Sequence, residues 1–229
     1  MKFILGPKKY QTEFNFTIPE SPKIGIFASG GLDSGILLCL VIEELIQTNR
    51  IHLVEIHTYT VLKFDGAMAY AERLFDWIQD FYKITLHIHN NIDNNDMAAG
   101  RVSKDTIEKI MSENPDTVFY LGMNYQADPL IKTFKHNLKV KGPTTDLEFL
   151  KFPFLYMIKP NMVDLYFKLG VQDLIPLTHS CTSSMTDFCN DCYSCEERAW
   201  AFEELNISPT FIPIDKSKLT WFPGKQGWY

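Results

Sequence analysis

The sequence has no apolar run long enough to cross a membrane. Its longest unbroken apolar stretch is 36–42, far short of the roughly 20 residues that span a bilayer. A membrane-spanning protein is therefore excluded. Residues 1–6 also lack the charged and then apolar arrangement of a secretory signal, because the apolar stretch stops at Pro7. We expect a cytoplasmic protein.

Basic residues are also few. The chain has 22 Lys and Arg against 28 Asp and Glu, a net charge of −6, which argues against broad nucleic-acid binding through a basic face. Apolar residues, in contrast, are abundant: 45 % of the chain is hydrophobic and 14 % is aromatic. That is enough apolar surface to offset the ordering entropy that keeps polar chains disordered. The length of 229 residues allows one medium domain with a small appendage.

Apolar strand patterns alternate with helical patterns along the chain. We expect strands at 23–28, 51–59, 84–88 and 117–122, and helices at 36–46, 66–82, 103–113, 161–169 and 195–205. This alternation implies parallel βαβ units with right-handed crossovers. The predicted fold class is α/β, a three-layer sandwich with a mostly parallel sheet. Ligands of such sheets bind outside the carboxyl ends of the strands.

The first predicted strand runs directly into a glycine loop, Ser29-Gly30-Gly31-Leu32-Asp33-Ser34. Two glycines let the backbone approach an anion closely, and the amides at the start of the next helix point towards it. The two serines add hydroxyl donors, while Asp33 either holds Mg²⁺ on phosphates or caps the helix. The spacing is neither a Walker loop nor G-x-G-x-x-G. A tight turn with an Asx cap is the alternative interpretation.

Four of the five cysteines lie close together: Cys181, Cys189, Cys192 and Cys195. In a reducing compartment such a group indicates metal binding more than disulfides. Four thiolates complete a closed tetrahedral site with no open position, so we expect a structural Zn²⁺. A catalytic zinc ion and an iron–sulfur cluster are the competing interpretations. Cys39 lies alone in an apolar helix and is expected in the core.

Together these motifs resemble a known family. The SGGLDS loop resembles the pyrophosphate loop of the N-type ATP pyrophosphatases, the PP-loop enzymes. The region from Leu177 to Phe202, which contains the four cysteines, is similar to the zinc region of the 7-cyano-7-deazaguanine (preQ0) synthases, the QueC-like enzymes of queuosine biosynthesis. The G-x-N…D segment and the lysine of that family have counterparts in Gly122, Asn124, Asp128 and Lys159. The resemblance runs from about residue 23 to residue 202.

The resemblance implies a fold and a domain division. Residues 23–178 would form a PP-loop ATP pyrophosphatase domain of the HUP type, preceded by an N-terminal extension, a hairpin or edge strand, at 1–22. Residues 179–205 would form a zinc-binding loop and helix, and 206–229 an aromatic C-terminal tail.

The resemblance also implies an activity. The family uses ATP to adenylate the carboxylate of 7-carboxy-7-deazaguanine, lets ammonia displace AMP, and dehydrates the amide to the nitrile with a second ATP. ATP, Mg²⁺ and a structural Zn²⁺ are the implied cofactors, and homodimers are common in the family.

By the same resemblance, each site residue has an expected role. The catalytic residues would be Asp33, Ser34 and Lys159. ATP would bind Ser29, Gly30, Gly31, Leu32, Asp33, Ser34 and the strand-end residues His57, Thr58 and Tyr59. The substrate would bind Gly122, Asn124, Asp128 and Arg198. A surface lysine, a turn-capping asparagine and a surface ion pair are the alternatives for Lys159, Asn124 and Arg198.

Several segments that meet the deazaguanine in the family differ here, including 58–64 after the second strand. Two other functions therefore stay open: a divergent relative that adenylates another acceptor, such as a protein, a nucleic-acid base or another small molecule, and a non-catalytic nucleotide-binding module. His87 and His89 share one strand face, for which a surface or packing role is favoured over a metal site.

Overall fold

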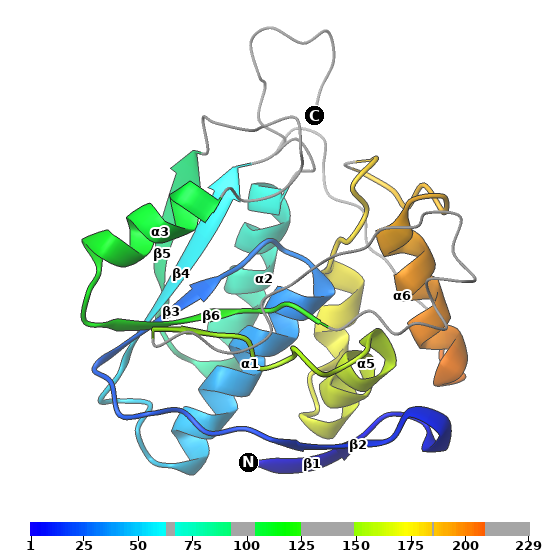
Figure 1. The fold of residues 1–229 in the computed structure, drawn as a ribbon, viewed down its shortest axis with the longest axis horizontal. Coiled ribbons are helices and arrows are strands. Elements are labelled where there is room, and N and C mark those ends of the chain that lie inside the picture. Colours follow the sequence, from blue (N-terminus) through cyan, green and yellow to red (C-terminus); the bar gives the residue numbers. More distant parts are fainter. Residues whose placement is uncertain (63–66, 93–103, 125–148, 185, 209–229) are drawn as a thin grey trace, which may run out of the picture.

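The computed structural model describes residues 1–62, 67–92, 104–124, 149–184 and 186–208 (Figure 1). The strands are β1 (Lys2–Leu5), β2 (Thr12–Asn15), β3 (Lys23–Phe27), β4 (Glu55–Leu62), β5 (His87–Ile92), β6 (Thr117–Leu121) and β7 (Leu150–Lys151). The helices are α1 (Leu32–Gln47), α2 (Ala67–Tyr82), α3 (Lys104–Glu113), α5 (Lys159–Lys168) and α6 (Tyr193–Glu204), with short 3₁₀ turns at Lys8–Tyr10 and Gln172–Leu177.

Five strands form a parallel sheet in the order β5-β4-β3-β6-β7. The central strand, β3, is buried on both faces because its residues alternate between two apolar layers. Ile24 and Ile26 pack into the layer that contains α1, α2 and α5. Phe27 packs on the opposite face against Ile110 of α3. The predicted three-layer α/β fold with a mostly parallel sheet is therefore confirmed.

Two strands begin later than the apolar pattern predicts. β4 starts at Glu55 instead of residue 51, because the chain turns at Arg50, whose carbonyl accepts a 2.9 Å hydrogen bond from the amide of Leu53. β5 covers His87–Ile92 instead of 84–88, since its register is decided by pairing with β4 from His57 onwards. The predicted helix end near residue 169 holds, with Gly170 in the left-handed conformation at φ +70°.

The N-terminal hairpin is separate from the main sheet. β1 and β2 pair antiparallel with each other and dock on α5. Asn161 on α5 donates to the carbonyls of Leu5 and Tyr10, at 3.3 and 3.1 Å, and Asp164 accepts from the amide of Gly6 at 2.9 Å. These bonds hold the extension against the α5 layer.

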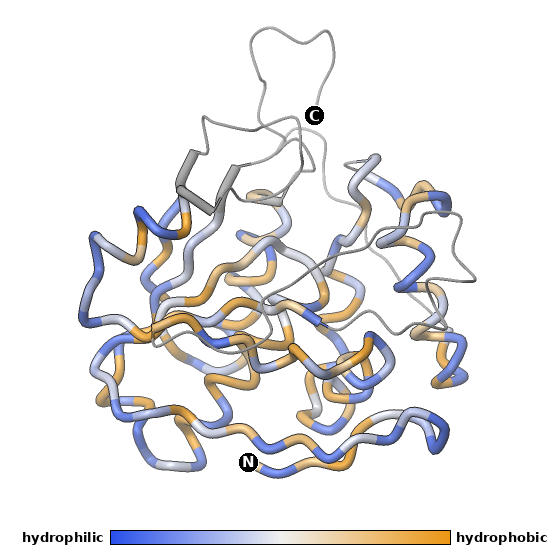
Figure 2. Tube along the Cα trace, viewed as in Figure 1, coloured by the Kyte–Doolittle hydropathy of each residue, from blue (hydrophilic) through white to orange (hydrophobic). Residues whose placement is uncertain are grey.

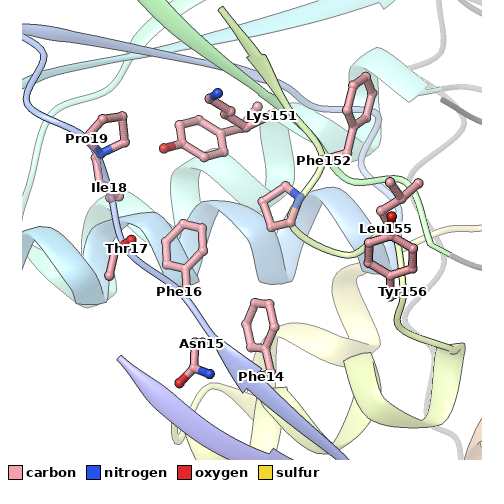
Figure 3. A pocket seen from close by; sticks show the side chains of 12 residues that line it. Phe14, Asn15, Phe16, Thr17, Ile18, Pro19, Lys151, Phe152, Leu155 and Tyr156 are labelled. Carbon is pink, nitrogen blue, oxygen red and sulfur yellow. The ribbon is translucent and has the colours of Figure 1, made fainter. Parts of the chain in front are cut away.

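A cavity of about 650 Å³ lies beside this hairpin, between β2 and the chain that follows β7 (Figure 3). Five of its twelve lining residues are aromatic: Phe14, Phe16, Tyr120, Phe152 and Tyr156. No residue of the glycine loop or of the cysteine group lines it.

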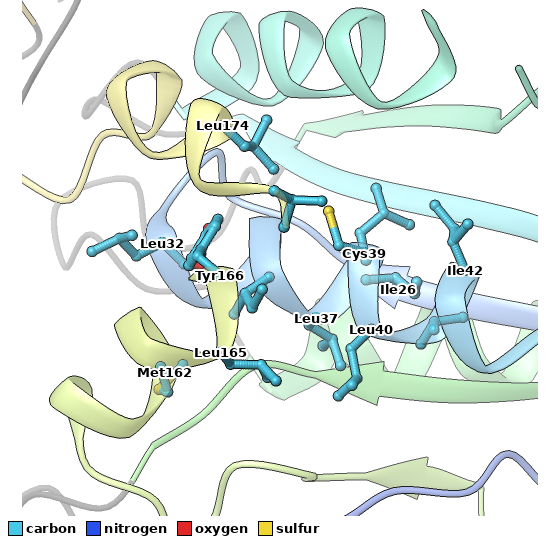
Figure 4. Close-up of a cluster of buried hydrophobic side chains, with 14 of the residues drawn as sticks. Ile26, Leu32, Leu37, Cys39, Leu40, Ile42, Met162, Leu165, Tyr166 and Leu174 are labelled. Carbon is cyan, nitrogen blue, oxygen red and sulfur yellow. The ribbon is translucent and has the colours of Figure 1, made fainter. Parts of the chain in front are cut away.

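The largest apolar layer surrounds α1, and Figure 2 shows the hydrophobic positions concentrated in the central strands and the helices against them. Cys39 is fully buried there, among side chains of α1, α5 and the 3₁₀ turn at 172–177 (Figure 4). Its predicted place in the core is confirmed. None of the described helices is both long and apolar enough to cross a membrane.

Candidate functional site

The site lies where β3 and β6 end side by side. From β3 the chain continues through α1 to β4, which pairs with one edge of β3. β6 pairs with the opposite edge of β3 and is itself followed by β7. Such a point, where the strand order reverses, is where ligands of open α/β sheets bind. The glycine loop follows β3, and Gly122 and Asn124 follow β6. A β-carbon on Gly122 would lie 3.0 Å from the carbonyl carbon and oxygen of Asp33, so the end of β6 lies close against the first turn of α1.

The glycine loop has a backbone shape that requires glycine at position 30. Gly30 has φ +73°, and a β-carbon there would lie 2.5 Å from Cβ of Tyr70 on α2. The hydroxyl of Ser34 accepts a hydrogen bond from the amide of Ser29 at 3.2 Å and donates to the carbonyl of Gly31 at 3.1 Å. Gly31 is the N-cap residue of α1, so Asp33 lies in the first helical turn and does not cap the helix. The helix amides thus face the strand ends, as anion binding requires.

We expect Gly30→Ala to destabilise the protein by more than Gly170→Ala. Both positions have a positive φ, at +73° and +70°, but a β-carbon at Gly170 meets nothing within 4 Å. The shared strain costs about 1–2 kcal/mol, and the contact with Tyr70 adds about 1–3 kcal/mol of overpacking at Gly30 alone. Urea denaturation of the two variants measures the difference, and equal losses would contradict this account of the loop.

Asp33 pairs with a lysine from a distant part of the chain. Nζ of Lys159, the first residue of α5, lies 2.6 and 2.7 Å from the two carboxylate oxygens of Asp33. The same Nζ lies 3.0 Å from Oε2 of Glu197 on α6. Lys159 is only 6 % exposed, which rules out the alternative of a surface lysine.

Two further residues complete this charge network. Asn124 donates from Nδ2 to Oε1 of Glu197 at 2.9 Å, and the hydroxyl of Tyr193 donates to the same oxygen at 3.4 Å. Asn124 therefore bonds to α6 and is not simply a turn cap. The structure thus brings together Asp33, Lys159 and Asn124, three of the predicted site residues, around Glu197. We refer to Asp33, Lys159, Glu197, Asn124 and Tyr193 as the charge network.

The electrostatics of the charge network follow from one ammonium group between two carboxylates. Burial raises the pKa of Asp33, and the charge of Glu197 acts in the same direction, against the opposing effect of Lys159. Burial by itself lowers the pKa of Lys159, but the two carboxylates outweigh it and raise the pKa. Lys159 is therefore a firmly charged ammonium at neutral pH. The guanidinium of Arg198 acts on the pKa of Asp33 in the same direction as Lys159, so two positive side chains balance the two carboxylates.

The sequence analysis missed Glu197 and Tyr193. Glu197 is 5 % exposed, although an isolated glutamate on a helix normally points into solvent. A signal was present: Glu197 and Arg198 precede the buried Ala201 and Phe202 by four residues, and so lie on the apolar stripe of α6. Charged residues on such a stripe indicate buried ion pairs.

Arg198 anchors the segment that precedes the cysteine group in sequence. It is 3 % exposed, so the alternative of a surface ion pair is wrong. Its guanidinium donates to Oγ1 of Thr178 at 2.7 Å and to the carbonyl of Ile175 at 3.1 Å. One residue further along, the amide of His179 donates to the carbonyl of Gly30 at 2.9 Å. Arg198 thereby links α6 to the glycine loop through the segment 175–179.

The predicted adenine-side residues lie along β4. Tyr59 is level with the end of β3, and its carbonyl accepts a 3.0 Å hydrogen bond from the amide of Ala28. Thr58 is fully buried. His57 pairs with Gly25, two residues before the end of β3, and therefore lies further from the loop. Asp128 lies outside the described residues.

The four cysteines form one group, as predicted. The Sγ atoms of Cys181, Cys189, Cys192 and Cys195 all lie within 4.8 Å of one another. Two of the pairs are 3.9 Å apart, between Cys189 and Cys195, and 4.0 Å apart, between Cys192 and Cys181.

Backbone amides are directed at the thiols. The amides of Ser183 and Ser184 donate to Sγ of Cys181 at 3.4 and 3.2 Å, and that of Cys192 donates to Sγ of Cys189 at 3.2 Å. Burial tends to raise the pKa of Cys192, but hydrogen bonds from Thr182 and Cys195 outweigh burial and lower its pKa to about 6. Backbone hydrogen bonds also lower the pKa of Cys189, whereas burial raises the pKa of Cys181 and Cys195. The loop therefore favours the thiolate, the form that binds metal, at Cys189 and Cys192.

This spacing fits a single metal ion. A tetrahedral ion with metal–sulfur bonds of about 2.3 Å holds its sulfurs about 3.8 Å apart, close to the observed pairs. A four-iron cluster would place its iron atoms between the thiolates and hold them further apart. The donor set consists of four soft sulfurs with no carboxylate, which suits zinc.

The family model described as "Queuosine biosynthesis protein QueC" matches residues 125–206, which include Lys159, the four cysteines and Glu197. This segment is similar to that family. The resemblance stated from the sequence is thus confirmed there, while a search of curated proteins finds no match.

Solved structures with partial similarity include three nucleotide-related proteins. The U34-tRNA thiolase NcsA from Methanococcus maripaludis, with its [4Fe-4S] cluster, is 15 % identical at a TM-score of 0.42, over 81 % of this chain and 65 % of its own. The FMN adenylyltransferase of Candida glabrata, with FMN and the ATP analogue AMPCPP, is 15 % identical at 0.48, over 86 % and 72 %. The NAD⁺ synthetase of Burkholderia pseudomallei is 17 % identical at 0.36, over 81 % and 79 %. This chain thus spans less than two thirds of the thiolase.

Proposed function

We propose that the protein is an ATP-dependent ligase that adenylates a carboxylate and transfers it to ammonia, with 7-carboxy-7-deazaguanine as substrate and preQ0 as product. The observation that carries the proposal is the charge network of Asp33, Lys159 and Glu197 beside the glycine loop. It supplies a buried cation and acidic oxygens at the strand ends, where an α/β sheet binds its ligand. The QueC match over residues 125–206 supports the same reaction class.

In the proposed reaction, the glycine loop binds the phosphates of ATP. Amides at the start of α1, with the hydroxyl of Ser29, would donate to the phosphate oxygens. Ser34, whose hydroxyl donates to the carbonyl of Gly31, would keep the loop in the shape that binds them. The backbone near Tyr59 would lie against adenine. Asp33 has the position and charge to hold Mg²⁺, which would neutralise charge on the pyrophosphate. These phosphate contacts matter because a carboxylate is a poor electrophile until it has been adenylated, and adenylation requires departure of pyrophosphate.

The chemistry then proceeds by displacement at phosphorus and at carbon. A carboxylate oxygen attacks the α-phosphorus of ATP and pyrophosphate leaves. Ammonia attacks the acyl carbon, AMP leaves with the oxygen, and a proton is lost to give the amide. The amide oxygen attacks a second ATP in the same way, pyrophosphate leaves, and departure of AMP with loss of both N–H protons gives the nitrile. The ammonium of Lys159 would stabilise the negative charge that develops on each leaving group.

The substrate would lie beyond β6. Gly122 lets the end of β6 approach Asp33 closely, and Asn124 is positioned by Glu197 at the same strand end. In this arrangement Asn124 contacts the substrate, with Asp128 following it in sequence, and Arg198 acts by holding the segment 175–178. The four cysteines bind a structural Zn²⁺ that anchors α6, and with it Glu197, beside the sheet.

The test is a product analysis of zinc-loaded protein with Mg-ATP, ammonium and 7-carboxy-7-deazaguanine. We expect the nitrile by mass spectrometry and two AMP and two pyrophosphate per nitrile. Asp33→Asn is expected to abolish both, and Asp116→Asn, an exposed control at the start of β6, to leave them unchanged. AMP without nitrile would move the proposal to another acceptor, and absence of turnover with retained ATP binding would indicate a nucleotide-binding module.

A further inference from the structure

A second group of metal-ligating side chains lies away from the glycine loop. Glu55 and His57 on β4 and His87 on β5 present one carboxylate oxygen and two ring nitrogens within 4.8 Å of one another. His89 lies two residues beyond His87 on the same face of β5. We call these four residues the histidine cluster.

The parallel register of the two strands assembles this cluster. His57 is paired with His87 across β4 and β5, and alternate residues of a strand share one face, so Glu55, His57, His87 and His89 lie on the same side of the sheet. The cluster occupies the first half of β4, whereas the glycine loop lies beyond the far end of β3. It is therefore distinct from the charge network and from the cysteine group.

His57 is the centre of the cluster. Its Nε2 lies 3.1 Å from Oε2 of Glu55, and its Nδ1 lies 2.9 Å from Nε2 of His89. Its ring also stacks on that of His87, with centroids 4.6 Å apart and planes 15° from parallel. With its ring proton on Nε2, His57 donates to Glu55. With the proton on Nδ1, it would instead donate to His89 and offer the lone pair of Nε2 to a cation beside the carboxylate. Two acceptors that face each other in this way form a site for a cation.

His89 has the position of an orienting partner. A histidine that binds a metal through one nitrogen nearly always gives its other N–H to a hydrogen-bond acceptor, which fixes the ring orientation. His89 is itself held by stacking on Tyr59, with centroids 4.7 Å apart and planes 11° from parallel. The central histidine is thus oriented from behind, while Glu55, with 51 % of its side chain exposed, leaves an approach from solvent.

We propose that Glu55, His57 and His87 bind a divalent first-row transition-metal ion, with Zn²⁺ as the representative, and that His89 orients His57 for this role. Two imidazoles and one carboxylate suit Zn²⁺ and its neighbours in the first transition row. They are too few oxygens for a calcium site. Three protein ligands leave a coordination position for water or an external ligand, in contrast to the closed cysteine group.

Lys23 competes with the metal for Glu55. Its Nζ lies 3.6 Å from Oε2 of Glu55, and 45 % of its side chain is exposed, so it can move away when a dication binds. Removal of this competing charge should strengthen metal binding. The proposal therefore predicts effects of opposite sign at neighbouring positions, which a general loss of structure would not produce.

The experiment titrates full-length protein, with the cysteine group already loaded with zinc, with Zn²⁺ by calorimetry and with Co²⁺ by absorption spectroscopy. We expect one further equivalent of each metal, and Co²⁺ bands without thiolate charge transfer, because no sulfur belongs to the histidine cluster. His57→Gln and His87→Gln should lose the further equivalent. His89→Phe, which keeps an aromatic ring on Tyr59 but no acceptor, should bind about 10- to 100-fold more weakly.

One control and one variant of opposite sign accompany these. His52→Gln removes an exposed histidine outside the cluster and should bind the metal as the unaltered protein does. Lys23→Gln removes the competing charge and should bind the metal more tightly. Absence of a further equivalent, or its retention in His57→Gln and His87→Gln, would overturn the proposal. Thiolate bands on the added Co²⁺ would do so as well, since they would assign the metal to the cysteine group. These outcomes do not depend on turnover, so they are distinguishable from failure of the proposed ligase activity.

Discussion

Replacement of Lys159 by Met is expected to abolish AMP formation and to lower the free energy of unfolding by about 3–5 kcal/mol. The substitution leaves Asp33 and Glu197 facing each other without their shared ammonium, at 2.6 and 3.0 Å from its former position. Loss of one member of a buried ion pair is more costly than loss of the whole pair, because the remaining charge is left without compensation. Urea denaturation and AMP quantification measure the two effects.

Lys168→Met is the matched control, since it makes the same change at the exposed end of the same helix. It should change stability by less than about 0.5 kcal/mol and leave turnover intact. Glu197→Gln is a milder variant that removes one charge from the network. It keeps the shape of the side chain and leaves Lys159 paired with Asp33, so stability should fall less than in Lys159→Met. Lys159→Met with turnover within tenfold of the unaltered protein would sink the assigned role.

The second large effect concerns the cysteine group. Cys195→Ser is expected to prevent binding of the proposed structural zinc and to release α6 from the sheet, with loss of turnover. Structural zinc contributes about 10–16 kcal/mol of binding free energy in zinc-finger peptides at pH 7, so the local structure around the four cysteines depends on the ion. Cys195 lies two residues before Glu197 on α6, and loss of the metal therefore reaches the charge network directly.

Metal analysis by mass spectrometry and amide hydrogen exchange across α6 test this expectation. Cys39→Ala is the matched control: it removes the fifth cysteine from the core of α1 and should keep the metal content while it lowers stability modestly. A Cys195→Ser variant that keeps full exchange protection in α6 and full turnover, with a metal content near zero, would contradict the structural role of zinc.

Much of the fold could be predicted because its signals are local. The apolar run Lys23–Phe27 followed by two glycines predicts a strand, a tight loop and a helix, and the structure has all three. Gly170 ends its helix as predicted because a left-handed residue is needed there. The strand starts of β4 and β5 were wrong by a few residues, since pairing with a neighbouring strand decides them and the apolar pattern does not report pairing.

The candidate site divides in the same way. The cysteine group could be predicted from spacing, because its four ligands lie within one short segment. Lys159 and Asp33 are 126 residues apart in sequence, and Glu197 joins them from a third segment. A residue pattern does not encode which of many lysines is buried next to which carboxylate.

The histidine cluster shows what the tertiary structure added. The sequence by itself placed His87 and His89 on one face of a strand, because side chains alternate along β-strands. Only the parallel register with β4 brought Glu55 and His57 alongside them, 32 residues away. The sequence by itself therefore determined the class of fold, the glycine loop and the cysteine group, since these depend on neighbours in the chain. The tertiary structure decided which groups pair within the charge network and assembled the histidine cluster, because buried charges and metal ligands are matched by contacts between distant segments.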